Sequence, residues 1–288
     1  MRLSITITDY NWTAEGVALP TALRNVVRAA DESSIDTVWV ADHLLQSAPG
    51  TVPTDPYLEA YATLGFLAAA SERVRLGTLV TAATFRQPAL LVKAVTTVDL
   101  LSGGRMWFGI GAGYDQGEAS ALGLPLPPAP ERFERPAETV HLARQMWAGD
   151  SRPFTGRHYR LEQPISSPPP VHPPGPPVLI GGTGERRTLR LVAELADACN
   201  LFDIPDGGRT VRHKLEVLAR HCAEVGRSYP EIEKTVSTRV TGGEDAGSLV
   251  ERCRTLAGYG IDHAIVLTDG PWAEPALATV ASAAEMLA

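Results

Sequence analysis

The chain has 288 residues, of which 44% are hydrophobic and 20% are charged, a composition typical of a globular protein with a sizeable core. Its formal net charge of -7 provides no basic field, which argues against nucleic acid as a partner. No apolar run approaches the roughly 20 residues that cross a bilayer, and the N-terminal residues lack a signal-peptide pattern, so we expect no membrane partner either.

Short β-rich segments alternate along the chain with segments of helical periodicity. The strands are predicted to begin at Leu3, Thr37, Arg75, Met106, Pro177, Ala198, Lys234 and His263. The helices are predicted over residues 19–33, 57–71, 88–101, 133–148, 185–196, 209–226, 246–258 and 272–287. This alternation indicates parallel strands joined by helical crossovers, and the nearly continuous apolar character of the strands indicates that both of their faces are covered.

Eight strand–helix units in a chain of this length predict an α/β fold, a closed (β/α)8 TIM barrel that forms a single domain over residues 1–288. A doubly wound open sheet is the competing topology. That fold usually has fewer strands and a nucleotide motif after the first one, whereas the segment DYNWTAEG contains no GxGxxG pattern. The barrel is therefore favoured.

Residues 153–177 do not fit a bare barrel, because this segment contains nine prolines. Proline at that density excludes a helix. The sequence FTGRHYRL is compatible with a small hairpin, followed by an extended crossing of polyproline type. Two interpretations stay open for this insertion before the fifth strand: a rigid surface connection, or an excursion that partly covers the carboxyl-terminal end of the barrel, which we call the mouth.

The cysteines and histidines show no disulfide or metal-binding pattern. Cys199, Cys222 and Cys253 are odd in number and lack CxxC spacing, so we expect reduced thiols in a cytoplasmic protein. The seven histidines form no HExxH or similar ligand spacing, and no metal is predicted.

The second predicted strand ends in a carboxylate followed by an imidazole, Asp42 and His43. Active sites of TIM barrels lie at the carboxyl ends of the strands. There the His43 ring can exchange a proton near neutral pH, and a neighbouring carboxylate would fix its tautomer. The structural alternative is that Asp42 caps the next turn and His43 is a rim residue.

Small residues at the next strand ends leave room for a ligand. Residues 81–84 (TAAT) follow the third strand, and glycines at 109, 111 and 113 let a flat ligand approach the fourth, although they are also compatible with tight packing. After the fifth strand, residues 181–184 (GGTG) precede a helix, and their backbone N–H groups suit an anion. This loop is not a Walker motif, because GxxxxGK[ST] is absent.

Together these motifs resemble the luciferase-like monooxygenase superfamily, a family of flavin and deazaflavin oxidoreductases. The resemblance extends from SITITDY to ADACNLFD and rests on VWVADHLL, on RVRLGTLVTAATFRQPALLVKAVTTVDLLSGGRMWFGIGAG, on ERF at 131–133, and on PPVLIGGTGERRTLRLVAELADACN. Within that family the chain looks most like the branch assigned to the deazaflavin coenzyme F420. The resemblance implies a barrel of the bacterial luciferase-like type.

The resemblance also implies roles for individual residues. His43 is the implied proton donor or acceptor beside the cofactor ring, with Asp42 next to it, and a non-prolyl cis peptide is implied at Leu79-Val80. Tyr114 is either a second acid–base group or a packing residue, and it stands where the sugar-phosphate dehydrogenases of the family have an acid. The implied cofactor contacts are Leu79, Val80, Thr81, Gly111, Ala112, Gly113, Gly181, Gly182, Thr183, Gly184 and Asn200, with residues 181–184 at the phosphate.

The implied activity is hydride transfer between F420 and a small organic substrate, by reduction of a C=C or C=N bond or by oxidation of an alcohol. Arg186, Arg187 or Arg209 would supply positive charge for the acidic tail of the cofactor. Two alternatives stay open: an FMN-dependent monooxygenase that uses reduced flavin and oxygen, and a non-catalytic barrel that only binds a ligand. A homodimer is expected from the resemblance alone.

Overall fold

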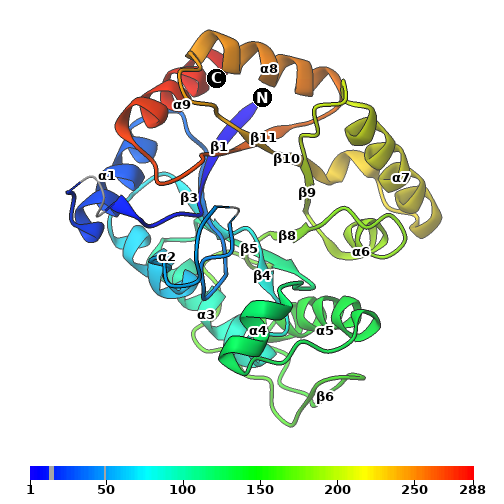
Figure 1. Cartoon of the computed structure of the whole chain (residues 1–288). Coiled ribbons are helices and arrows are strands. Elements are labelled where there is room, and N and C mark those ends of the chain that lie inside the picture. The colour runs from blue at the N-terminus through cyan, green and yellow to red at the C-terminus, as the bar shows by residue number, and fades with distance from the viewer. Residues whose placement is uncertain (13–15, 49) are drawn as a thin grey trace.

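The strands close into a parallel barrel, as the sequence predicts (Figure 1). The computed structural model describes residues 1–12, 16–48 and 50–288. Within these residues the strands pair in the order β3-β2-β1-β11-β10-β9-β8-β5-β4, and a further pairing of β3 with β5 closes the ring. Their bounds are β1 (Arg2–Ile7), β2 (Thr37–Val40), β3 (Arg75–Thr78), β4 (Thr81–Ala82), β5 (Met106–Gly111), β8 (Val178–Gly181), β9 (Ala198–Phe202), β10 (Glu233–Arg239) and β11 (His263–Leu267). Because β3 and β4 are two parts of one barrel strand, the ring has eight positions.

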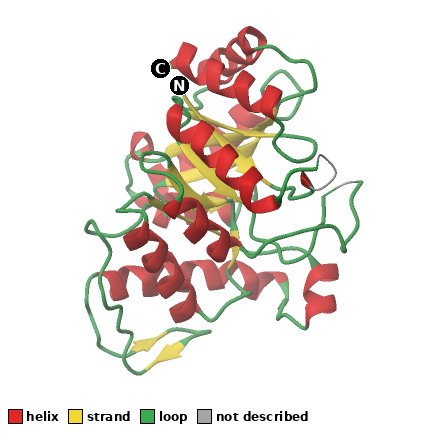
Figure 2. Cartoon of the chain, turned by 90° about the vertical axis from the view of Figure 1, so that its left-hand side faces the viewer, coloured by secondary structure: helices red, strands yellow, loops and turns green. Residues whose placement is uncertain are grey.

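The helices surround the barrel on its outside (Figure 2). They are α1 (Leu19–Glu32), α2 (Ala60–Ala69), α3 (Pro88–Leu101), α4 (Gln116–Leu122), α5 (Ala129–Trp147), α6 (Thr188–Leu195), α7 (Arg209–Val225), α8 (Ala246–Gly258) and α9 (Glu274–Leu287), with a 3-10 turn η2 (Tyr229–Glu231). The helix α4 was not predicted, because its seven residues are too few to show a helical period. No helix in the described parts of the chain is apolar over a length that would cross a membrane.

The proline-rich segment begins with the predicted hairpin, formed by β6 (Phe154–Thr155) and β7 (Arg160–Leu161) as an antiparallel pair. The rest of the segment runs beside α3. The N–H of Val171 donates to the Asp99 carboxylate at 2.9 Å, and Asp99 lies in the last turn of α3, at the amino-terminal end of the barrel. This part of the segment is therefore a surface connection and does not cover the mouth.

Two tryptophans fill the barrel interior. Trp39 on β2 and Trp107 on β5 lie with ring centroids 5.8 Å apart. Gly77 on β3 makes room for both, since a Cβ atom there would lie 2.7 Å from Trp39 and 2.8 Å from Trp107. We call this group the inner cluster, and it also contains Leu179, Ala198 and Ile265. Leu79 and Val80 pack against it, so the tryptophans support the floor of the mouth.

A buried polar network closes the opposite, amino-terminal end of the barrel. The Nε2 atom of the fully buried His263 lies 2.5 Å from the Ser4 hydroxyl, and its Nδ1 atom lies 2.7 Å from the Glu233 carboxylate. The arrangement is similar to a serine–histidine–acid triad, but Ser4 is 0% exposed and lies at the end of the barrel associated with stability. We assign the network a structural role, because it joins β1, β10 and β11.

Gly77→Ala is expected to destabilise the protein by about 1–3 kcal/mol, because the added methyl group overlaps the indole ring of Trp39 and the Cβ atom of Trp107. Denaturation followed by tryptophan fluorescence measures the free energy of unfolding. Gly258→Ala is the control, because an added Cβ at that end of α8 meets nothing within 4 Å; it is expected to change stability by less than about 1 kcal/mol. Equal stability of Gly77→Ala and the wild type would contradict the packing argument.

Candidate active site

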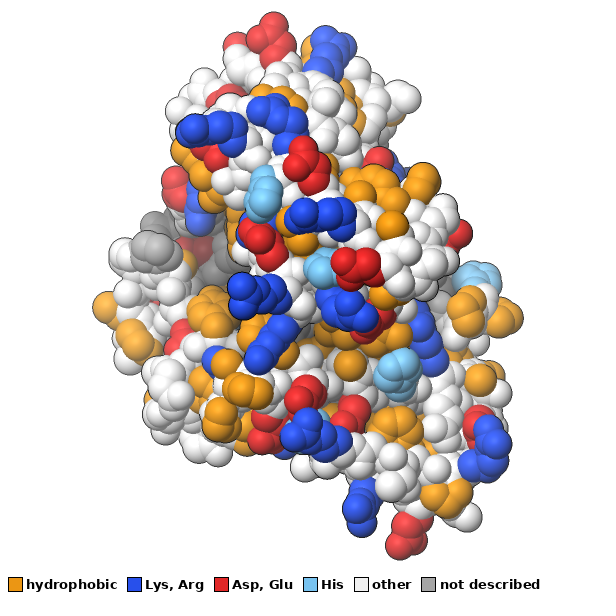
Figure 3. Space-filling view, turned by 90° about the vertical axis from the view of Figure 1, so that its right-hand side faces the viewer, with side chains coloured by type: hydrophobic (Ala, Val, Ile, Leu, Met, Phe, Trp, Pro, Cys, Tyr) orange, Lys and Arg blue, Asp and Glu red, His pale blue; other side chains and the backbone are white. Residues whose placement is uncertain are grey.

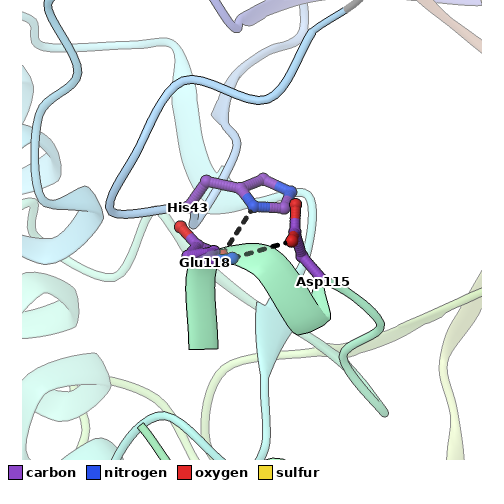
Figure 4. A group of neighbouring side chains, drawn as sticks. All are labelled: His43, Asp115 and Glu118. Carbon is purple, nitrogen blue, oxygen red and sulfur yellow. Dashed lines mark hydrogen bonds and ion pairs between the residues drawn. The ribbon is translucent and has the colours of Figure 1, made fainter. Parts of the chain in front are cut away.

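The imidazole of His43 and the carboxylate of Glu118 form a hydrogen-bonded pair at the mouth (Figure 4). His43 lies in the segment after β2, and Glu118 lies in the first turn of α4. His43 Nδ1 is 2.9 Å from Glu118 Oε2. The other oxygen, Oε1, accepts the backbone N–H groups of Leu44 and Leu45, the latter at 3.0 Å. A carboxylate only accepts hydrogen bonds, so Nδ1 carries a proton and Nε2 is the atom free to exchange one.

This pairing shifts the pKa values of both groups. Burial by itself lowers the pKa of His43, but the hydrogen bond and the negative charge of Glu118 outweigh it, so the pKa lies above its ordinary value. Burial by itself raises the pKa of Glu118, and the hydrogen bonds from His43 and the two backbone N–H groups reverse that effect. The pair therefore consists of an ionised acceptor and a base that holds its proton well.

Asp42 does not orient His43, so that expectation is wrong. The Asp42 carboxylate is 2% exposed and accepts two hydrogen bonds from the Arg86 guanidinium, at 2.5 and 3.0 Å. Arg86 also bonds Glu59 and lies over the Tyr61 ring at 4.9 Å. Burial raises the pKa of Asp42, and the bidentate bonds from Arg86 oppose this shift. Asp42 thus anchors the segment that carries His43 to the residues before α2 and α3.

Two tyrosines lie against the other side of the His43 ring. The Tyr114 hydroxyl is 3.3 Å from His43 Nε2, and Tyr114 is 72% exposed. Tyr57 meets the imidazole edge to face, with ring centroids 6.4 Å apart. Because Nδ1 donates its proton to the hydrogen bond with Glu118, Nε2 of a neutral His43 has a free lone pair. This lone pair accepts a hydrogen bond from the Tyr114 hydroxyl. The contact supports the acid–base interpretation of Tyr114 over a packing role.

Leu79 and Val80 form the floor of the mouth, and the peptide bond between them is cis, as the resemblance implied. Both side chains are half-buried over the inner cluster. Gly111 and Gly181 flank Val80: a Cβ atom would lie 2.8 Å from a Val80 methyl group at Gly111 and 2.9 Å from one at Gly181. These glycines are therefore required by the packing of the chain itself, whether or not a ligand lies above them.

The loop at residues 181–184 has free backbone donors. Among the residues that the structure describes, the N–H groups of Gly182, Thr183 and Gly184 donate to no protein acceptor. The loop leads into α6, whose amino-terminal dipole adds positive potential. Gly182 has a φ of 120°, and a Cβ atom at Gly184 would lie 2.9 Å from the Thr188 hydroxyl, so both positions favour glycine. The loop suits an oxyanion such as a phosphate.

Two predicted cofactor contacts are buried and bonded within the protein. The Thr81 hydroxyl is 2.8 Å from that of Tyr61, and Thr81 is 0% exposed, which removes it from the surface available to a ligand. The Asn200 amide donates to Thr235 at 2.9 Å and accepts from Ser237 at 3.1 Å. Thr81 thus joins β4 to α2, and Asn200 joins β9 to β10.

The end of β5 is held by the ERF motif. Ala112 and Gly113 are half-buried where this strand leaves the barrel, and Arg132 donates to the Gly113 carbonyl at 3.1 Å. Gly113 has a φ of 72°, which allows the chain to turn toward α4. The predicted positions thus lie where the chain leaves β5 and turns toward α4, which carries Glu118.

The sequence did not assign the roles of Glu118 and Arg86. Asp115 and Glu118 have the D-x-x-E spacing of a helix capping box. Asp115 does cap α4, accepting the Glu118 N–H at 2.9 Å, but the Glu118 side chain turns to His43 instead of the start of its own helix. Arg86 lies in the TFRQP motif, which carried the resemblance without indicating a partner for Asp42.

His43, Asp115 and Glu118 also place their ligand atoms within 4.8 Å of one another, as a metal site would (Figure 4). Their hydrogen bonds favour a different interpretation. Glu118 accepts three N–H groups and Asp115 accepts one, so the carboxylate oxygens that would ligate an ion already have donors. We interpret the group as a hydrogen-bond network.

Comparison with known proteins agrees with the barrel. Residues 1–284 match the family model described as luciferase-like monooxygenase. The F420-dependent glucose-6-phosphate dehydrogenase of Kineococcus radiotolerans is 30% identical over 255 residues, which cover 86% of this chain and 72% of the relative. Across relatives of that name, the chain spans between 51% and 72% of their length.

Two solved structures share the fold at low sequence identity. An F420-dependent secondary alcohol dehydrogenase in complex with an F420–acetone adduct has a TM-score of 0.81 at 16% identity, covering 99% of this chain and 98% of that one. The monooxygenase RslO1 from Streptomyces bottropensis has a TM-score of 0.81 at 18% identity, covering 100% and 97%. Since the family model matches nearly the whole chain, the protein belongs to the luciferase-like monooxygenase family.

Proposed function

We propose that this protein is an F420-dependent oxidoreductase that transfers a hydride between the deazaflavin and a small organic substrate. The observation that carries the proposal is the His43–Glu118 pair, which holds a proton at the mouth of the barrel. The relatives named F420-dependent glucose-6-phosphate dehydrogenase support the same cofactor for this chain. Such a pair can give or take the proton that accompanies hydride transfer.

The residues of the mouth fit a phosphorylated tricyclic cofactor. Leu79 and Val80 offer an apolar floor backed by the inner cluster, on which an aromatic ring can lie. The free N–H groups of residues 182–184 would hold the phosphate. When bound, the deazaflavin supplies a ring carbon that accepts or gives up a hydride.

The chain's own residues then move the proton. His43 Nε2 gives a proton to the substrate when a C=C or C=N bond is reduced, and takes the hydroxyl proton when an alcohol is oxidised. Glu118 is a positioning residue, because it fixes the tautomer and the orientation of the ring. Tyr57 and Tyr114 surround the imidazole with aromatic surface, which suits a small uncharged substrate better than a sugar phosphate.

We also propose a homodimer in the cytoplasm. The helix α2 has the sequence AYATLGFLAA, with no charged side chain on any face, and Ala62 and Ala69 are exposed. A helix that is apolar all round is normally buried, which supports a second copy over this face. Cys199, Cys222 and Cys253 are unpaired and buried, which fits a reducing compartment.

His43→Ala is expected to bind F420 with near wild-type affinity and to lower turnover by about 10²–10⁴-fold, because the floor and the phosphate loop remain while the proton donor is lost. Fluorescence titration measures cofactor binding, and the absorbance of F420 follows turnover with a panel of small alcohols. His141→Ala, on the exposed face of α5, is the control.

Each outcome of this experiment bears on one function. Unchanged turnover in His43→Ala would remove His43 from the chemistry. Binding of FMN without F420 by the wild type would instead favour the monooxygenase, whose fold RslO1 shares. Binding of neither cofactor would favour a barrel without catalytic activity.

Glu118→Gln is expected to move the pH dependence of His43 to lower pH. The amide oxygen still accepts the N–H groups of Leu44 and Leu45, but the charge that raises the pKa of His43 is lost while burial continues to lower it. If His43 gives a proton, activity falls as the pH rises through its pKa. If His43 takes one, activity rises there, and in both cases the transition shifts downward.

This transition is measured from kcat/KM against pH, and titration of the histidine signals by NMR provides a readout independent of activity. Gln116→Ala is the matched control, because Gln116 is exposed on the same helix and its side chain donates to Ser120, away from His43. A transition at the same pH in Glu118→Gln and the wild type would show that Glu118 does not set the pKa of His43.

A further inference from the structure

A pocket of about 700 Å³ lies between the segment that leads from β9 into α7 and the helix α8. Its lining residues include Phe202, Asp203, Ile204, Thr238, Leu256 and Tyr259. The volume is within the range of roughly 300–1,000 Å³ that binds small organic molecules. None of the residues that we place at the cofactor or beside the imidazole lines this pocket.

Part of the pocket lies on the outer face of the barrel wall. Val236 on β10 belongs to the core between the strands and the helices, and Thr238 points to the same side because it is two residues further along the strand. The Thr238 hydroxyl donates to the Asp203 carboxylate at 2.8 Å, so this carboxylate also lies on the outer side. The wall formed by β9 and β10 therefore separates Asp203 from the mouth.

Large apolar side chains contribute to the lining of the pocket. Phe202 is 52% exposed and Ile204 is 43% exposed. The Tyr259 ring packs closely against the loop before α7, where Gly208 has a φ of 75° and an added Cβ atom would overlap the ring. Exposed aromatic and aliphatic surface inside a pocket suits the apolar body of a ligand.

Charges of both signs lie close together on the side of the molecule that carries α6 and α7 (Figure 3). Among the lining residues of the pocket, Arg239 pairs with Asp269 at 2.6 Å. Arg252 pairs with Glu244 at 2.9 Å. Asp203 differs, because in the described parts of the chain its carboxylate forms no ion pair and accepts a hydroxyl hydrogen bond instead. The pocket therefore favours a positively charged ligand, since its arginines are already paired and its carboxylate is not.

We propose that this pocket is a second ligand site, which binds an organic cation: a protonated amine attached to an apolar or aromatic body. The ammonium group donates to the free oxygen of Asp203, Oδ1, and the apolar body covers Phe202 and Ile204. The hydroxyl groups of Thr241 and Thr255 also line the pocket and can accept the remaining N–H groups. This binding is separate from hydride transfer and does not require the cofactor.

The test uses three probes that share one apolar body and differ in charge: phenylpropylamine, phenylpropanamide and phenylpropanoate. Isothermal titration calorimetry of the wild type gives the dissociation constant of each. The amine is expected to bind about 3–10-fold more tightly than the neutral amide, the range that one partly exposed, charge-assisted hydrogen bond provides. The carboxylate is expected to bind most weakly, and high salt is expected to reduce these differences.

Asp203→Asn is expected to remove the preference for the amine, because the amide keeps the shape of the side chain and loses its charge. Ile204→Ala is expected to weaken the amine and the amide to a similar degree, about 2–5-fold, because it removes apolar surface from the pocket. Glu251→Gln is the control, because Glu251 is exposed on α8 and does not line the pocket. Wild-type melting temperatures establish that the variants are folded.

The outcomes decide whether a second site exists and whether it selects a cation. Absence of binding by the wild type, or equal binding of the amine and the amide, would overturn the proposal. An unchanged preference in Asp203→Asn would overturn the role of that carboxylate. His43→Ala is expected to bind the amine as the wild type does, and loss of binding in this variant would place the amine in the mouth instead. None of these measurements uses F420, so they leave the proposed function untouched.

Discussion

The geometry of the mouth depends on the hydrogen bonds that the Glu118 carboxylate accepts. It accepts two consecutive backbone N–H groups of the segment after β2 as well as the ring of His43, so α4 holds both the loop and the imidazole that the loop carries. A buried carboxylate with several N–H donors stays ionised. Its charge, in turn, keeps the proton on His43. Glu118 therefore contributes both to the path of the chain and to the raised pKa of His43.

The rigidity of the floor has a separate origin in the barrel interior. Trp39 and Trp107 occupy the space below Leu79 and Val80, and they fit because Gly77 has no side chain. Large side chains opposite glycine give a dense interior that resists rearrangement. The mouth thus combines a fixed apolar floor with a polar rim held by hydrogen bonds. Asp42 is buried and forms its ion pair with Arg86.

The barrel was predictable from the sequence because its signal is local and repeated eight times: each strand is a short apolar run and each helix has its own period. The position of His43 and of the glycine loop followed from the rule that strand ends form the mouth. The partner of His43 was not predictable, since Glu118 is 75 residues away and reaches it through a seven-residue helix. Asp42 is adjacent in the chain, but neighbouring side chains of an extended segment point in opposite directions, and Asp42 faces Arg86.

The exposure of Tyr114 has a consequence for the origin of the transferred proton. Its hydroxyl contacts Nε2 of His43, while the residue is 72% exposed to solvent. A hydroxyl in this position can pass protons between the imidazole and solvent. In the reaction that we propose, the hydrogen that His43 exchanges with the substrate would therefore come from water, whereas the hydride would come from its donor.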